Sequence, residues 1–253
     1  MIDFTADGNV AIITMNRPEA RNAVNGAISS GLEAAIDRLE ADDSLWSGIL
    51  THTGPVFSAG ADLKAIAEGR FRELSTARGG FGGIVLRSRT KPLIAAIDGP
   101  ALAGGTEIAL TCDLRVASTA ARFGLPEVKR SLIAAAGGLV RLPRTIPLAT
   151  AMEMVLTGDP ISAERALDLG LINELCEPGQ AFDAARRLAD RVNANGPLAV
   201  RESRRLVLES FTQTDAESIA AAGEAQMGLR STEDFAEGPR AFIEKRPPVW
   251  KGR

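Results

Sequence analysis

The sequence is poor in the side chains that most often carry catalysis. Its 253 residues include one histidine, two cysteines and no tyrosine, and aromatic residues make up 4%. Histidine is the usual general base of serine hydrolases and the commonest protein ligand of zinc, and here no HExxH motif is present. Ser58 also lacks a GxSxG setting, because Val56 stands two residues before it. Both classes are therefore excluded, and we expect His52, at the end of a strand, to be structural.

The cysteine spacing and the net charge limit further the classes of protein to which the chain could belong. Cys112 and Cys176 do not form a CxxC pair, so we expect them to be reduced and mostly buried, as suits a cytoplasmic protein. The net charge is −3 and the pI about 5.4, which argues against nucleic-acid binding through a broad basic patch. The first residues do not resemble a signal peptide, and every apolar stretch is interrupted before it could span a membrane.

The hydrophobic pattern predicts an α/β fold with a helical tail, because strand-like and helix-like segments alternate over the first 180 residues. The length and a hydrophobic content of 45% suit one domain with a small extension, and Gly196-Pro197 divides residues 1–196 from 197–253. Residues 65–90 mix Arg, Glu, Ser and Gly, so we expect a mobile loop that leads into a helix ending near Thr90. The predicted strands are 10–15, 48–51, 92–97, 114–117 and 172–175, and the predicted helices are 25–42, a short one near 61–64, 104–110, 147–157, 162–169, 180–194 and 197–245.

With histidine and tyrosine scarce, acid–base chemistry falls to carboxylates, lysine or cysteine, and two glutamates stand in unusual settings. Glu107 lies in an apolar helix start after Gly104-Gly105, and Glu127 follows Pro126 in a rigid turn. A buried carboxylate is costly without a partner or a function. From the residues alone, Glu107 could equally be a helix N-terminal carboxylate satisfied by the dipole, and Glu127 an ordinary surface residue.

Two glycine-rich turns precede predicted helices, one at residues 58–62 and one at 103–105. Small residues at such positions leave backbone N–H groups open to an anion or a developing oxyanion. The same glycines could instead serve close packing of a helix on a strand. No GxxxxGK[ST] loop is present, and no GxGxxG follows a strand, so nucleotide binding of those two kinds is not indicated.

These features occur in an order that resembles the crotonase superfamily, the enoyl-CoA hydratase/isomerase family. The motifs are an NRP…RNA segment from Asn16, FSAGADLK from Phe57, IDGPALAGGTE from Ile97, CDLRVAS from Cys112 and FGLPE from Phe123. Each motif is weak alone, but five in order are strong, and the match continues to Phe242-Ile243-Glu244-Lys245-Arg246, so it covers nearly the whole chain. The resemblance implies a crotonase (ClpP-like) spiral of ββα units with a C-terminal helical region that builds a homotrimer or a dimer of trimers.

The resemblance also implies an activity, the reversible addition of water to a 2-trans-enoyl-CoA thioester, as in fatty-acid β-oxidation. The family's oxyanion hole of two backbone N–H groups falls on Ala61 and Gly104, and its two catalytic glutamates fall on Glu107 and Glu127. We assign Glu127 as the donor of the C2 proton and Glu107 as the partner that positions water. The family implies no metal and no tightly bound cofactor, since coenzyme A enters as part of the substrate.

Coenzyme A contacts are implied in three segments. Arg21 and Ala23 match residues near the nucleotide, and Phe242 and Lys245 match a C-terminal segment that often reaches coenzyme A from a neighbouring subunit. For Arg21 and Lys245, plain surface charge remains an alternative. The contacts along the thioester and adenine fall on Ala59, Ala61, Asp62, Leu63, Lys64 and Gly104.

One departure from the family's hydratases keeps the substrate open. The run that is commonly Pro-Gly-Ala-Gly-Gly is Ala134-Ala135-Ala136-Gly137-Gly138 here, with Ala135 in place of a glycine near the water site. The following LVRLPR also resembles carnitinyl-CoA dehydratases. The alternatives are therefore that dehydratase, an isomerase or a hydrolase of the same fold, and, from another class, a non-catalytic acyl-CoA-binding or RNA-associated protein.

Overall fold

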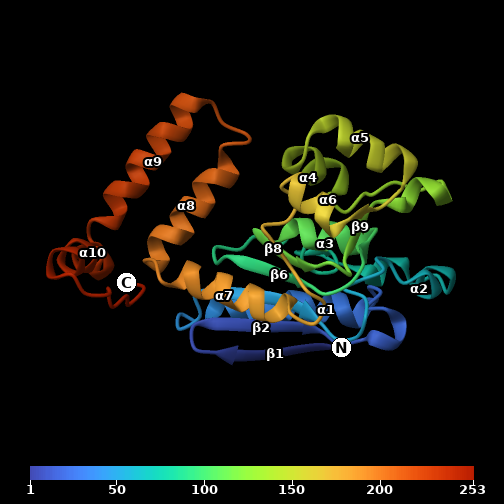
Figure 1. Cartoon of the computed structure of the whole chain (residues 1–253), viewed down its shortest axis with the longest axis horizontal. Helices are drawn as coiled ribbons and strands as arrows, with labels where there is room; N and C mark the ends of the chain where they lie inside the picture. Colours follow the sequence, from blue (N-terminus) through green and yellow to red (C-terminus); the bar gives the residue numbers. More distant parts are fainter.

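The computed structural model describes residues 1–253 and is built on a six-stranded sheet in the order β1-β2-β3-β6-β8-β11 (Figure 1). The edge strand β1 runs antiparallel to β2, and every other neighbouring pair is parallel. The strands are β1 (Ile2–Asp7), β2 (Val10–Met15), β3 (Ser47–His52), β6 (Leu93–Ile97), β8 (Leu114–Ser118) and β11 (Glu174–Cys176). The predicted α/β class is confirmed.

Helices cover both faces of this sheet, which is why its inner strands are continuous apolar runs. On one face, α1 (Gly26–Ala41) buries Leu32 and Ile36 in the main core beside Leu50 of β3. On the other, α7 (Ala181–Asn193) buries Ala185 and Ala189 against Ile49, the neighbouring residue of β3. Successive side chains of a strand point to opposite faces, so Ile49 and Leu50 serve different cores.

A second layer stands beside the main sheet and carries the turns of interest. Its small sheet has the order β10-β9-β7, and a two-stranded hairpin β4–β5 lies nearby in the sequence. Five α-helices and a 3-10 helix, η3, accompany it. The elements are β4 (Ser75–Thr76), β5 (Gly80–Phe81), β7 (Ala101–Leu102), β9 (Arg122–Gly124), β10 (Ile161–Ser162), α2 (Leu63–Ala67), α3 (Gly104–Thr111), η3 (Pro126–Arg130), α4 (Gly138–Thr145), α5 (Leu148–Thr157) and α6 (Ala163–Asp168).

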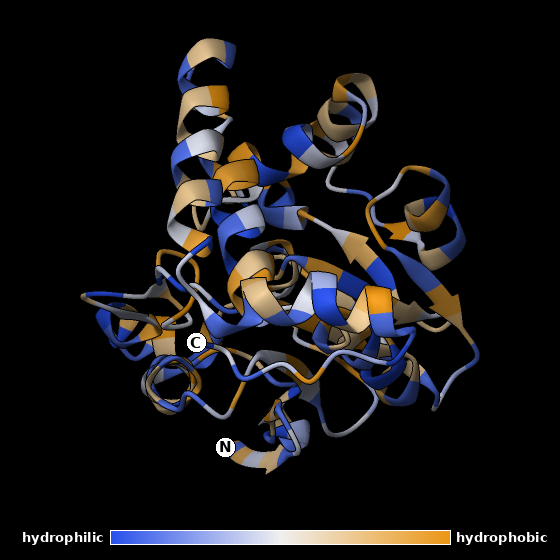
Figure 2. Ribbon diagram, turned by 90° about the vertical axis from the view of Figure 1, so that its left-hand side faces the viewer, coloured by the Kyte–Doolittle hydropathy of each residue, from blue (hydrophilic) through white to orange (hydrophobic).

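The C-terminal helices extend away from the core as an arm (Figure 1). They are α8 (Pro197–Glu209), α9 (Asp215–Leu229) and α10 (Glu233–Glu244), and α9 buries no residue. Large apolar side chains along the arm are exposed, among them Phe211, Ile219, Met227 and Phe242. Figure 2 shows apolar residues interspersed with polar ones on these helices. None of the helices is both long and apolar enough to cross a membrane.

Residues 65–90 differ from the prediction. The prediction of a helix ending near Thr90 is wrong. The structure has only turns over 82–86, where Gly82 and Gly83 have positive φ angles of 62° and 69° that disfavour a helix. The expected loop also contains the 3-10 helix η2 (Phe71–Leu74) and the hairpin β4–β5. Ion pairs from Arg78 to Glu33 and Asp37 attach this segment to α1.

Strand β1, helix α4 and the short strands β7, β9 and β10 were not predicted, and α8 to α10 were predicted as one helical stretch. The remaining predicted elements are present with ends shifted by a few residues at most. His52 is structural, as expected: its Nε2 accepts the N–H of Asp98 at 3.0 Å, and its ring packs edge-on against Phe57. Cys112 is buried, Cys176 is partly buried, and they form no disulfide.

Candidate active site

The two glycine-rich turns lie against each other. A Cβ placed on Gly60 would come within 2.8 Å of both the Cβ of Ala103 and the backbone N of Gly104, so only glycine allows this approach. A parallel bridge sets the first turn, since Val24 donates its N–H to Gly60 and accepts that of Asp62. The N–H of Ala61, between them, therefore points away from Val24 and makes no hydrogen bond within the protein.

The second turn supplies another open donor. Ala103 precedes α3 with φ 52° and ψ −128°, a conformation that L-residues rarely adopt. It directs the chain into the helix, whose first N–H, that of Gly104, has no intrahelical partner. The Phe81 ring packs over Gly104, since a Cβ there would lie 2.5 Å from two of its carbons. Two free backbone donors thus lie at one place beneath an aromatic wall.

Glu107 lies one turn into α3 and is only 3% exposed. Its Oε1 accepts the backbone N–H of Gly138 at 2.9 Å. Burial, together with the negative charge of Glu127, raises the pKa of Glu107 to about 7, although the Gly138 and Ala136 N–H groups and Arg141 act to lower it. The carboxyl is therefore poised to titrate near neutral pH, as a proton-transfer group needs.

Glu127 reaches the same place from η3. Its Oε2 is buried and has no hydrogen-bond partner within the protein. Burial raises the pKa of its carboxyl, while its own backbone N–H and the charge of Arg130 lower it. A buried carboxylate oxygen without a partner is costly, which makes Glu127 a candidate for a functional role. The alternative of an ordinary surface glutamate is wrong for Glu127, and a helix dipole alone does not describe Glu107.

The residues expected near coenzyme A form a surface beside the Ala61 turn. Arg21 is exposed, and its side chain has no partner within the protein. Its carbonyl oxygen accepts the N–H of Ala59 at 3.0 Å, which attaches Arg21 to the turn that contains Ala61. Leu63 and Lys64 are exposed at the start of α2, and Ala23 is half-buried. The side chain of Asp62 is occupied differently: it caps α2 through the N–H groups of Lys64 and Ala65 and forms an ion pair with Arg17 at 2.7 Å.

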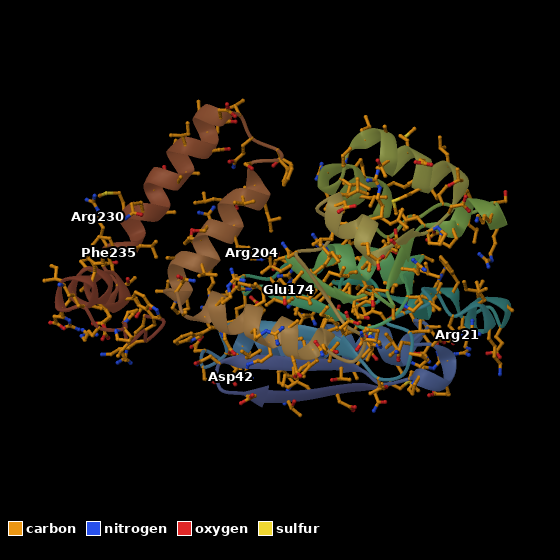
Figure 3. The ribbon with its side chains drawn as sticks, viewed as in Figure 1. Arg21, Asp42, Glu174, Arg204, Arg230 and Phe235 are labelled. Atoms are coloured by element: carbon orange, nitrogen blue, oxygen red, sulfur yellow. The ribbon has the colours of Figure 1, made fainter.

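The two C-terminal candidates lie at the far end of the molecule. Phe242 is 85% exposed on α10, and Lys245 is exposed just after it. Figure 1 shows α10 and α2 at opposite ends of the molecule. Figure 3 likewise shows Arg21 and Phe235, a residue of α10, near opposite ends. One chain alone therefore does not bring Phe242 and Lys245 to Arg21.

Several neighbours of the carboxylates were not singled out from the sequence. They are Gly138 and Ala136, whose N–H groups face Glu107, Phe81 over Gly104, and Arg141. Ala135, the residue that departs from the hydratase pattern, is itself exposed. The only sequence signal for this turn was the small-residue run at 134–138, and it does not say which amide meets which carboxyl.

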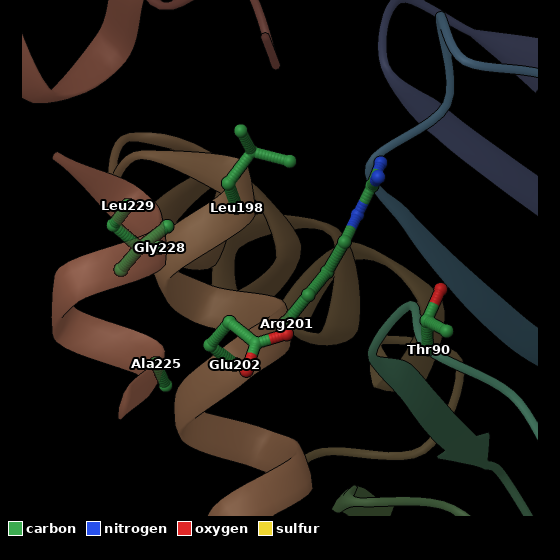
Figure 4. Close-up of a pocket in the computed structure, with 7 residues that line it drawn as sticks. All are labelled: Thr90, Leu198, Arg201, Glu202, Ala225, Gly228 and Leu229. Atoms are coloured by element: carbon green, nitrogen blue, oxygen red, sulfur yellow. The ribbon is translucent and has the colours of Figure 1, made fainter. Parts of the chain in front are cut away.

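A groove elsewhere on the molecule is separate from this site. It lies between α8 and α9 and is lined by Thr90, Leu198, Arg201, Glu202, Ala225, Gly228 and Leu229 (Figure 4). None of these residues contacts the two carboxylates or the two free amides. Its walls belong largely to the C-terminal arm, so it is not part of the candidate catalytic centre.

Comparisons with known proteins agree with the arrangement. The model of the enoyl-CoA hydratase/isomerase family matches residues 5–253. An enoyl-CoA hydratase of Mycobacterium tuberculosis is 42% identical over 253 residues, covering 97% of this chain and 94% of that protein. A carnitinyl-CoA dehydratase of Salmonella agona is 37% identical over 258 residues, covering 100% and 98%. A crystal structure of an enoyl-CoA hydratase from M. tuberculosis H37Rv superposes with a TM-score of 0.96 at 48% identity, covering 100% and 99%.

Proposed function

The chain belongs to the enoyl-CoA hydratase/isomerase family and has its crotonase fold, and we propose that it catalyses the reversible addition of water to a 2-trans-enoyl-CoA thioester. The observation that carries this proposal is the meeting of two buried carboxyls with two unpaired backbone N–H groups. Such a site can hold a thioester oxygen on one side and a water molecule on the other.

The free amides of Ala61 and Gly104 form the proposed oxyanion hole. As the enoyl thioester accepts oxygen at C3, negative charge moves to the thioester oxygen, where both N–H groups donate to it. They are held in place by the Gly60–Gly104 contact before the reaction, so no reorganisation is needed. One preorganised donor of this kind is worth about 3 kcal/mol of transition-state stabilisation.

The carboxyls of Glu107 and Glu127 have different roles in water positioning and proton transfer. Glu107 is fixed by the Gly138 N–H on one oxygen, and its other oxygen accepts a hydrogen bond from water. Glu127, with its free Oε2, takes the proton of that water as the oxygen attacks C3 and delivers the proton to C2. Hydroxyl thus ends on C3 and hydrogen on C2, and both carboxyls return to their starting state, ready for the reverse reaction.

Coenzyme A would lie along the Arg21–Lys64 surface. Arg21 and Lys64 offer unpaired cations for its phosphates, and the small or apolar residues Ala23, Ala59 and Leu63 leave room for adenine. Phe242 and Lys245 would come from a neighbouring subunit, because α10, which ends at its C-cap Lys245, lies at the opposite end of the chain from α2 (Figure 1). The exposed apolar side chains of the arm suit a homotrimer or a dimer of trimers. The proposal includes no metal, no bound cofactor, and a cytoplasmic role in β-oxidation.

Carnitinyl-CoA dehydration is the second candidate. The Salmonella relative carries that name, and the Ala134–Ala136 run next to Glu107 departs from the usual hydratase pattern. Dehydration uses the same two carboxyls in reverse, so the catalytic centre suits both reactions. The two reactions would differ in the residues that contact the acyl group of the substrate.

A substrate panel tests the proposal. The purified chain is given crotonyl-CoA, longer and branched 2-enoyl-CoA esters, carnitinyl-CoA, a 3-enoyl-CoA and a saturated acyl-CoA, and hydration, dehydration, isomerisation and coenzyme A release are followed. We expect kcat/KM for a 2-enoyl-CoA ester to exceed that for the other classes by more than tenfold. A preference for carnitinyl-CoA would select the second candidate, and tight binding without turnover of any ester would contradict both.

A further inference from the structure

Arg141 joins two segments of the site that are far apart in the sequence. It lies in α4, and its Nη2 donates to the carbonyl oxygen of Val85 at 2.6 Å. Its Nη1 donates to the carbonyl oxygen of Ala136 at 3.4 Å. Gly137 makes this possible, because a Cβ there would lie 2.1 Å from Nη1. The Arg141 residue is half-buried, and both hydrogen bonds of its guanidinium go to backbone carbonyls.

Each of these carbonyls belongs to a wall of the catalytic centre. Val85 follows the turn that begins at Phe81, to whose carbonyl it donates its N–H at 3.4 Å, and the Phe81 ring covers Gly104. Ala136 leads directly into Gly138, whose N–H holds Glu107. One side chain therefore connects the wall over the oxyanion donors with the turn that fixes a catalytic carboxyl.

Arg141 is also an electrostatic neighbour of Glu107. Two charged groups face that carboxyl, Glu127 from η3 and Arg141 from α4, and they act in opposite directions on its ionisation. The cation favours the ionised form of Glu107, which the proposed mechanism uses to hold water. Burial of the guanidinium strengthens this interaction, because little water separates the two groups.

We propose that Arg141 is a positioning residue that holds the Phe81 wall and the Gly138 turn at a fixed separation and places a cation beside Glu107 that favours its water-binding, ionised form. The inference rests on the proposed hydratase function, since Glu107 must have a role for its positioning to matter. It assigns Arg141 no contact with substrate. It also explains the local sequence, in which Gly137 leaves the space that the guanidinium occupies.

Two substitutions separate the geometric role from the charge. Arg141→Gln removes the charge and the bridge, whereas Arg141→Lys keeps the charge but cannot donate in a fork to both carbonyls. Arg144→Gln is the matched control: Arg144 lies on the same helix but is exposed and stacks over Phe211. The readouts are kcat and KM for the best ester of the substrate panel, each measured from pH 5 to 9, and the thermal midpoint.

We expect Arg141→Gln to lose about 100-fold in kcat, as misplacement of about 1 Å can cause, with little change in KM. Its acid inflection should move to higher pH. Arg141→Lys should lose a similar factor in kcat but keep the inflection near that of the unsubstituted protein. Arg144→Gln should match the unsubstituted protein in both. Loss of activity in Arg141→Gln with an unmoved inflection, or an unchanged kcat, would overturn the proposal.

A titration without turnover distinguishes this outcome from failure of the hydratase function. In protein labelled with ¹³C at the glutamate carboxyl, the Glu107 signal, assigned through Glu107→Gln, is followed against pH. The proposal expects Glu107 to ionise at higher pH in Arg141→Gln than in Arg144→Gln, whether or not any ester is hydrated, and equal titration contradicts it. If Arg141→Gln does not fold, an Arg141→Lys chain with full kcat contradicts it too.

Discussion

The N–H of Gly138 donates to Oε1 of Glu107 at 2.9 Å, which ties the first turn of α4 to a carboxyl on α3. Gly138 is the first residue of α4, so its N–H has no partner within the helix and is free for this role. The contact holds one oxygen of Glu107 in place. A Cβ on Gly138 would lie 3.1 Å from that carboxyl oxygen and 2.9 Å from Cδ1 of Leu125, so a larger residue would crowd both side chains.

Burial of Glu107 should cost stability above neutral pH. Its pKa is raised from 4.5 to about 7, so the folded chain holds a proton that the unfolded chain has lost between these values. The free energy of unfolding therefore falls as pH rises through this range. Glu107→Gln removes the titration, and its stability relative to the unsubstituted protein should increase from pH 5 to pH 8 by on the order of 3 kcal/mol.

Urea unfolding at both pH values measures this change. Glu153→Gln, which removes an exposed carboxyl from α5, is the control and should shift the stability equally at both pH values. A Glu107→Gln chain whose relative stability does not depend on pH would show that the carboxyl is not protonated in the folded state near neutral pH.

The pH dependence of turnover should also report the ionisation of Glu107. Water positioning requires ionised Glu107, and its pKa is raised to about 7 by burial, so kcat/KM should fall as the pH drops below about 7. The apparent value belongs to the Glu107–Glu127 pair, because the two carboxyls interact. Initial rates from pH 5 to 9 in a constant-ionic-strength buffer measure it, and a profile flat down to pH 5 would be inconsistent with this role.

A single methyl group added at Gly60 should reduce the catalytic rate. Gly60→Ala would force the turn away from Ala103 and Gly104, which separates the two oxyanion donors, and kcat should fall by about 100-fold. Gly170→Ala is the control, since Gly170 has a similar positive φ of 76° but no atom within 4 Å of its added Cβ. Both substitutions carry the same backbone strain, so equal losses of kcat would refute a specific role for the Gly60 contact.

The order of elements was largely predictable, because the apolar runs of β2, β3, β6 and β8 and the periodic face of α1 are local patterns. Strand β1 was not, since its exposed residues lack the burial that makes a strand visible in sequence. The helix near Thr90 was predicted wrongly because helix-forming residues there follow Gly82 and Gly83, whose conformations prevent a helix.

The site was predictable only in part. Motif order pointed to Glu107 and Glu127, but which groups meet them depends on the packing of α3 against α4, with no local signature. The contact of Gly138 and the bridge of Arg141 join residues separated by 31 and 56 positions, respectively. The motif assigns Asp62 to coenzyme A, and that contact stays a prediction. Only the structure shows that its side chain pairs with Arg17 and caps α2.

The distance of Phe242 and Lys245 from Arg21 leads to a prediction about assembly. If a neighbouring subunit completes the coenzyme A site, a chain with Glu127→Gln and a chain with Phe242→Ala plus Lys245→Glu should each be poorly active. Mixing them under conditions of subunit exchange should restore part of the activity, since some sites then combine an intact centre with an intact arm. Light scattering should show a trimer or hexamer, and a monomer without complementation would contradict the shared site.

The central claim is that Glu107 and Glu127 perform the water chemistry while other residues bind the ester. Glu107→Gln and Glu127→Gln preserve shape, so the measurement is kcat for crotonyl-CoA, or the preferred ester of the panel, with the Kd of a saturated acyl-CoA as a companion. The account predicts that each variant loses at least about 100-fold in kcat, the lower range for a lost acid–base group, with Kd changed less than threefold. Near-normal turnover by either variant would contradict it.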